Sequence, residues 1–202
     1  MKKERIGWKL LLGLGLAALS LAAVALVPAV ASTEKAAAHD HASHATGNEG
    51  LQDELAQVRR VTAKYHRVEE AIAAGYELGW VNGSGVRIIT GCISNVVNPA
   101  AGAMGYHYFH PQLMADNAVE ALEPEALVYE STPDGGRKLV AVEWVVRGPL
   151  TNPPGPSDAP SVLGMPMHVL NPAVGFWLMH AWVWKHNPAG MLEDWNPEVT
   201  CP

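Results

Sequence analysis

Four short apolar stretches in the second half of the chain constrain its fold most strongly. They read MGYHYFH (residues 104–110), ALVYE (126–130), LVAVEWVV (139–146) and FWLMHAWVW (176–184). Their length and their β-branched and aromatic residues favour β-strands. Glycine, proline and Asn-Pro dipeptides lie between them and predict turns. The sequence therefore predicts a largely antiparallel sheet.

Each of these predicted strands carries at least one ionisable residue among apolar neighbours. We single out His107, Glu130, Glu143 and His180. Burying a carboxylate without a partner costs several kcal/mol, so each needs a donor, a cation or a metal. Imidazole and carboxylate together suit zinc, manganese or iron. We predict a mononuclear divalent metal site in a sheet-lined pocket, and leave open whether it is catalytic.

His168 is a further candidate ligand, because it ends a stretch rich in proline that we expect to cover one end of the sheet. Several methionines occur near the candidate ligands and give copper as an alternative metal. They are Met104, Met165, Met167 and Met179.

Two interpretations without metal compete with this one. In the first, the same polar groups and nearby aromatic residues line a pocket for a small molecule. Those aromatic residues are Tyr106, Tyr108, Trp182 and Trp184. In the second, the protein is structural, and Glu130 or Glu143 pairs with a basic residue in a buried network. The basic candidates are Arg87, Arg137 and Lys185.

The N-terminus has the pattern of a secretory signal. A basic start precedes an almost wholly apolar run over residues 10–27, and small residues follow Pro28. We predict a signal peptide over residues 1–31, and a secreted or periplasmic protein without stable membrane insertion after cleavage. The apolar run also reaches the length of a spanning helix, so a retained anchor is the alternative.

Residues 32–47 are small and polar and contain His39, His41 and His44, a composition typical of a disordered linker. Residues 48–202 have the length of a single domain. Without residues 1–31 the chain has ten Lys and Arg against nineteen acidic residues, a formal charge of −9. This charge and the lack of a basic cluster argue against a nucleic-acid partner.

Cys92 and Cys201 are the two cysteines of the chain. In an exported protein an even number of cysteines favours a disulfide, so we predict that they pair. The alternative is that they act as two soft metal ligands.

The predicted domain begins with a helix. Thr46 and Glu49 form a capping-box pattern, and Leu51, Leu55 and Val58 begin an apolar face that ends before Gly75. Asp134-Gly135-Gly136 predicts a hairpin between the second and third apolar stretches. We therefore predict an α+β fold: one long N-terminal helix packed on a curved antiparallel sheet of four to six strands, in a cone-like or small-barrel arrangement.

Several motifs in the segment from Cys92 to Cys201 resemble a family of exported bacterial proteins. They are GAMGYHY (residues 102–108), LVYE (127–130), VAVEW (140–144), HAWVWKHNPAGM (180–191) and WNPEVTC (195–201). The resemblance implies export. It implies no particular activity, fold or cofactor, so the candidate site depends on the strand argument.

Overall fold

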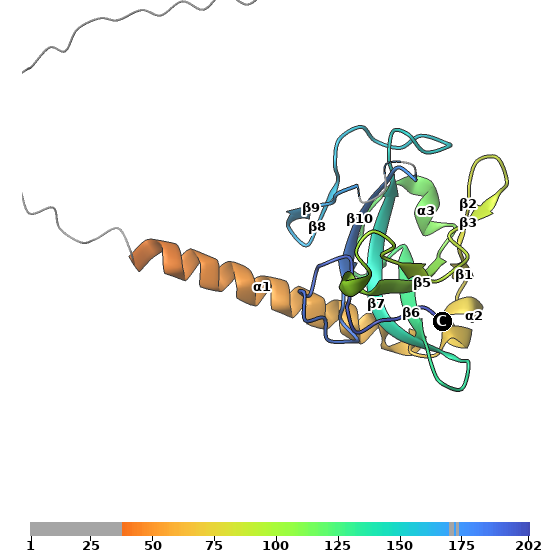
Figure 1. The fold of residues 1–202 in the computed structure, drawn as a ribbon. Helices are drawn as coiled ribbons and strands as arrows, with labels where there is room; N and C mark the ends of the chain where they lie inside the picture. The colour runs from red at the N-terminus through yellow and green to blue at the C-terminus, as the bar shows by residue number, and fades with distance from the viewer. Residues whose placement is uncertain (1–37, 170–171, 173) are drawn as a thin grey trace, which may run out of the picture. The chain divides into compact units, whose positions relative to one another are not determined.

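The computed structural model describes residues 38–169, 172 and 174–202. The predicted signal peptide lies outside the described residues, as do residues 32–37 of the predicted linker. None of the described helices has both the length and the apolar character needed to cross a bilayer. The described part is an α+β fold, as predicted (Figure 1).

Helix α1 (Ala38–Thr62) leads into a 3-10 turn, η1 (Ala63–Tyr65), and a short helix, α2 (Val68–Ala73). Helix α1 thus begins within the stretch predicted as a linker, ahead of Thr46. Alanine is the best helix former, and residues 38, 42 and 45 are alanines.

The single helix predicted up to Gly75 is interrupted after Thr62. Arg67 is extended (φ −94°, ψ 132°) and forms an isolated antiparallel bridge with Lys138. The Tyr129 hydroxyl donates a 2.6 Å hydrogen bond to the carbonyl of Tyr65. Contacts with the sheet therefore replace helical hydrogen bonds at this point. The spacing of apolar residues along the sequence does not reveal such contacts.

The main sheet has six strands, within the predicted range, and all its pairs are antiparallel. Its order is β1-β5-β6-β7-β10, and β4 also pairs with β5. The strands are β1 (Glu77–Leu78), β4 (Ile93–Ser94), β5 (Ala103–Phe109), β6 (Ala126–Ser131), β7 (Arg137–Arg147) and β10 (Phe176–Ala181). The edge strands β1 and β10 do not pair with each other, so the sheet is open and the small-barrel alternative is wrong.

Short elements complete the described fold. Two small hairpins pair β2 (Trp80–Val81) with β3 (Arg87–Ile88) and β8 (Ser161–Val162) with β9 (Met165–Pro166). The others are η2 (Pro99–Ala101) and α3 (Leu113–Asp116). The predicted hairpin at Asp134-Gly135-Gly136 joins β6 to β7 and is confirmed.

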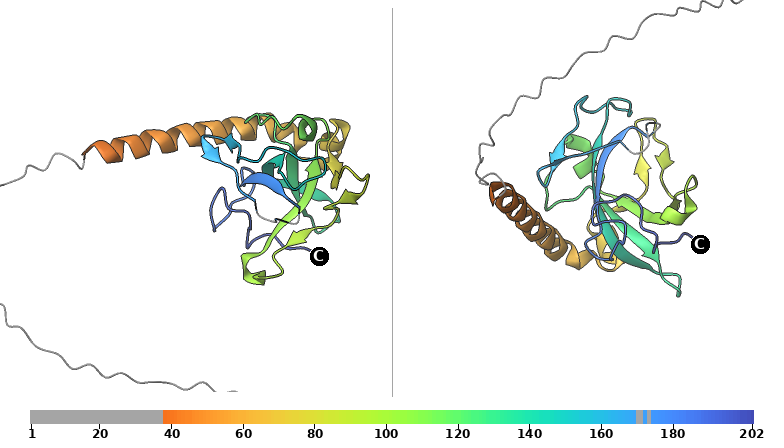
Figure 2. Two further views of the ribbon diagram at one scale, coloured as in Figure 1. Left: turned by 90° about the horizontal axis from the view of Figure 1, so that it is seen from above. Right: turned by 60° about the vertical axis from the view of Figure 1, so that its left-hand side comes forward.

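The two faces of the sheet have different partners. On one face, Leu55 and Val58 of α1 belong to the same core cluster as Leu127, Tyr129 and Trp144 of the sheet. Figure 2 shows α1 running along this side and continuing past the sheet. The helix therefore packs on the sheet as predicted. Alternation of side chains leaves His107, Glu143 and His180 on the opposite face.

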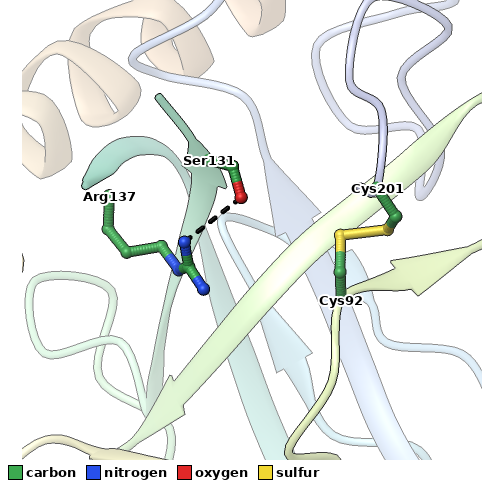
Figure 3. Close-up of a disulfide and its surroundings, with 4 residues drawn as sticks. All are labelled: Cys92, Ser131, Arg137 and Cys201. Carbon is green, nitrogen blue, oxygen red and sulfur yellow. Dashed lines mark hydrogen bonds between the residues drawn. A yellow bond between two sulfur atoms is a disulfide. The ribbon is translucent and has the colours of Figure 1, made fainter. Parts of the chain in front are cut away.

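Cys92 and Cys201 form a disulfide, as predicted (Figure 3). It ties the segment just before β4 to the end of the chain, across a sequence separation of 109 residues. The alternative of two soft metal ligands is therefore wrong.

We expect the double variant Cys92→Ser/Cys201→Ser to unfold more easily, because its unfolded chain is no longer closed into a large loop. For a loop of this length the chain-entropy account gives a loss of about 4–5 kcal/mol. Urea unfolding followed by tryptophan fluorescence measures the change. An unchanged midpoint would contradict a constraint by this cross-link.

Candidate metal centre

Three of the four singled-out residues lie in strands of the main sheet and meet on one face. His107 lies in β5, Glu143 in β7 and His180 in β10. Glu143 and His180 are direct partners in the register of β7 and β10. His107 lies two strands from Glu143, opposite Val128 of β6.

The side chains of His107 and Glu143 reach each other diagonally across β6. Strands β5 and β7 lie on either side of β6, which places their backbones about 10 Å apart. The β6 residue opposite Glu143 is Ala126, and the β6 residue opposite His107 is Val128. Both β6 side chains are shorter than those of His107 and Glu143, which meet above them at 3.6 Å.

The candidate ligand atoms lie close together, and each histidine faces a different oxygen of Glu143. His107 Nε2 lies 3.3 Å from His180 Nε2 and 3.6 Å from Glu143 Oε2, and His180 Nε2 lies 3.5 Å from Glu143 Oε1. With one ligand atom taken from each residue, all three atoms lie within 4.8 Å of one another. Ligand atoms about 2.0–2.1 Å from a tetrahedral ion are about 3.3–3.4 Å apart, so the group is close to the size that a single ion requires. We call these three residues the triad.

The triad is shielded from solvent. The exposed fractions are 2 % for His107, 3 % for Glu143 and 0 % for His180. Among the described residues, the ion-pair partners of Glu143 are the two imidazoles, and no lysine or arginine is among them. A buried carboxylate in this position lacks the permanent cation that usually compensates for lost hydration.

Burial changes the acid–base properties of the triad. Burial, together with the neighbouring His180, lowers the pKa of His107 to about 3. Burial raises the pKa of Glu143 to about 7, although the His180 ring opposes that change. Burial disfavours a charged His180, but Glu143 and Asp194 outweigh it and raise the pKa of His180. His107 is therefore neutral near pH 7, which is the form that binds metals.

Asp194 supports the triad from a loop after β10. Its Oδ1 lies 3.4 Å from His180 Nδ1, and its Oδ2 lies 2.9 Å from His168 Nε2. A carboxylate behind a ligating histidine orients the ring and fixes its tautomer. His107 Nδ1 and His180 Nδ1 are both buried without a hydrogen-bond partner among the described residues, so the 3.4 Å separation of His180 and Asp194 is an ion-pair contact.

The structure does not bring the other predicted ligands into the triad. Glu130 accepts a 2.8 Å hydrogen bond from Lys185 Nζ, one of the pairings considered for a structural role. Glu130 is opposite Lys138 in the register, five residues along β7 from Glu143 and thus about 16 Å away along the strand. His168 is exposed and reaches the triad only through Asp194.

Three of the four predicted aromatic pocket residues lie away from the triad. Tyr108 belongs to the core on the helix side, and Tyr106 and Trp184 pack against it. Trp182 is buried and stacks on the His180 ring at 6.3 Å between ring centroids.

The methionines of the copper alternative do not gather at the triad. Met167 and Met179 belong to the helix-side core, and Met165 packs against it. Met104 lines the cavity beside the triad.

The sequence analysis missed two carboxylates, the partly buried Asp194 and the buried Glu125. Asp194 lies in a loop, where strand alternation gives no signal. Glu125 precedes the β6 stretch, and its Oε2 accepts a 2.9 Å hydrogen bond from the backbone N–H of Val145. Burial raises the pKa of Glu125 to about 8. In the sequence, the position of Glu125 between Pro124 and an apolar run was the one signal that this carboxylate is buried.

A cavity of about 730 Å³ opens beside the triad. His107 and Glu143 are part of its lining, together with residues of β5, β10 and the segment around β4. This volume lies within the range of small-molecule sites, about 300–1,000 Å³. A ligand in the cavity can therefore reach the triad.

No family model, curated protein or solved structure matches the chain. The resemblance to a family of exported proteins remains a prediction, and the chemistry has to be argued from the triad itself. Two imidazoles and a carboxylate, buried together within 4.8 Å, are a group that can hold a metal ion. Three protein ligands leave at least one coordination position for water or substrate.

The variant Glu143→Gln separates a metal site from a structural network, because it keeps the shape of the side chain and removes its charge. A carboxyl group whose pKa is raised by folding destabilises the fold above that pKa. At pH 8, we expect the metal-free variant to melt at or above the temperature of the metal-free wild type. Differential scanning calorimetry measures this.

The matched variant Glu130→Gln should melt slightly lower, because it weakens the ion pair with Lys185. A loss of stability in metal-free Glu143→Gln larger than in Glu130→Gln would support the structural network.

Proposed function

We propose that the protein is an exported metalloprotein in which His107, Glu143 and His180 bind one divalent transition metal. The supporting observation is that the two Nε2 atoms and the Glu143 oxygens facing them lie 3.3–3.6 Å apart, and that the buried carboxylate has no lysine or arginine partner among the described residues. A metal ion would supply the missing positive charge and use the Nε2 atoms of both histidines. The donor set suits zinc, manganese or iron.

An open coordination position would face the cavity. Structural zinc sites use four protein ligands, whereas sites with three leave a position for water or substrate. A metal held there would supply Lewis acidity or an activated water, and a redox metal would also bind oxygen. The role of the three side chains would be to hold the ion beside the cavity, whose lining includes His107 and Glu143.

Asp194 is the positioning residue of this proposal. With Nε2 of His180 on the metal, its Nδ1 would carry the proton and face Asp194 Oδ1, which lies 3.4 Å away at ion-pair distance. His168 Nε2 in turn lies within hydrogen-bond distance of Asp194 Oδ2, at 2.9 Å, which helps to hold the carboxylate in place.

Two features support export. The first 31 residues have the pattern of a secretory signal. The Cys92–Cys201 disulfide is typical of proteins that fold in an oxidising compartment.

We expect the exported, untagged protein, purified without chelators, to contain about one equivalent of a single metal. Inductively coupled plasma mass spectrometry measures the content and identifies the element. The variant His107→Ala/His180→Ala should lose the metal, because two of three ligands are gone. Glu130→Gln is the control and should keep it, because Glu130 pairs with Lys185 outside the triad.

Deletion of residues 32–47 should also leave the metal content unchanged, which separates the triad from the histidines of that segment. A folded wild-type protein that contains no metal and takes up none on titration would contradict the proposal.

We expect Asp194→Asn to weaken metal binding about 10- to 100-fold, as loss of a carboxylate behind a ligating histidine does in other metal sites. Competition with a chromophoric chelator measures the affinity. Glu198→Gln, an exposed carboxylate in the same terminal segment, should bind as the wild type does. If the two variants bind the metal with equal affinity, the positioning role proposed for Asp194 is contradicted.

A metal-free module for a small molecule is the second candidate function, favoured by the size of the cavity. It predicts that chelators leave the melting temperature unchanged. The metal proposal predicts a lower melting temperature on chelation, because an ion bound only to the folded state stabilises that state.

A further inference from the structure

The cavity beside the triad is largely apolar. Two sides of it come from the sheet face and from the segment that includes β4. Its main apolar residues are Ile93, Met104, Phe109, Phe176, Leu178 and Trp195. The ionisable residues of the lining are His107 and Glu143 alone, within the described part of the chain. A ligand that fills this space therefore needs an apolar body without a second charged group.

The charge of the site selects the polar end of the ligand. A divalent ion and one carboxylate leave a net charge of about +1, and both histidines bind as neutral rings. A single anionic oxygen donor on the open position would neutralise this charge. Carboxylate oxygens are good ligands for zinc, manganese and iron.

The rim of the cavity also favours an apolar ligand. Val96 and Val97 line it with exposed fractions of 84 % and 92 %. The side-chain oxygen of Asn95 accepts hydrogen bonds from the backbone N–H groups of Val97 and Asn98, which fixes this turn. Neighbouring apolar side chains held in water at the mouth of a cavity are typical of a surface that contacts a ligand.

We infer that the cavity binds an apolar monocarboxylic acid whose carboxylate occupies the open position on the metal. This inference rests on the proposed metal site. The apolar body is an alkyl chain or an aryl group. In both cases the ligand carries one terminal carboxylate and no other charge. The body lies against Phe176, Leu178 and Ile93, and the carboxylate faces His107 and Glu143.

The test uses the full exported protein loaded with one equivalent of zinc, with metal content measured first. Octanoate represents the alkyl acids and 3-phenylpropanoate the aryl acids, and octanamide and 3-phenylpropanamide are their neutral counterparts. Isothermal titration calorimetry gives the four affinities, and the titrations are repeated on the metal-free protein. We expect at least one acid to bind the zinc-loaded protein at least tenfold more tightly than its amide does. The same acid should bind the metal-free protein at least tenfold more weakly than it binds the zinc-loaded protein.

The variant Ile93→Glu adds a negative charge to the cavity wall at a residue outside the triad. We expect it to keep its zinc and to bind the acid at least tenfold more weakly. Val86→Glu adds the same charge on an exposed turn outside the cavity lining and should bind as the wild type does. Thermal melts of both variants confirm that they are folded.

The outcomes distinguish this inference from the proposed function. A protein that holds no zinc overturns both. If the protein holds zinc but binds neither acid, or binds acid and amide equally, the proposed metal site stands and the inference of an acid ligand is overturned. Equal binding of an acid with and without zinc overturns the carboxylate–metal contact.

Discussion

The buried carboxylate of Glu143 is the constraint on which the site depends. It lies between two imidazoles on a sheet face, with 3 % of its surface exposed and no lysine or arginine as a partner among the described residues. Such a group is costly in a folded protein unless a cation or a proton compensates for it. The distances to His107 and His180 are close to those of ligands around one ion, and for this reason we propose a metal as the compensating cation.

The helices pack on one face of the sheet, and the triad lies on the other. Helices α1 and α2 cover one face with Leu55, Val58 and Ala71, and this core includes most of the large side chains of the sheet. The other face carries the triad and the cavity. The disulfide holds the segment before β4 against the end of the chain, beside that cavity. Cys92 itself belongs to the cavity lining, so the cross-link also stabilises the wall of the site.

Much of the fold and three of the site residues could be predicted from the sequence, because strand alternation and turn residues are local signals. Alternation indicates which face a side chain takes, and it identified His107, Glu143 and His180. It does not give the position along neighbouring strands. Glu130 was therefore predicted as a ligand, although the register places it opposite Lys138 and beside Lys185. Asp194 lies in a loop, and the break after Thr62 depends on contacts with the sheet, so neither had a periodic signal.

The most direct test of the metal site is a crystal structure of the exported protein with anomalous data collected on both sides of the absorption edge of the metal found in it. The account predicts one anomalous peak about 2.0–2.2 Å from His107 Nε2, His180 Nε2 and a carboxylate oxygen of Glu143. A protein crystallised with that metal that shows no peak there, and instead a direct hydrogen bond between the two imidazoles, would contradict it.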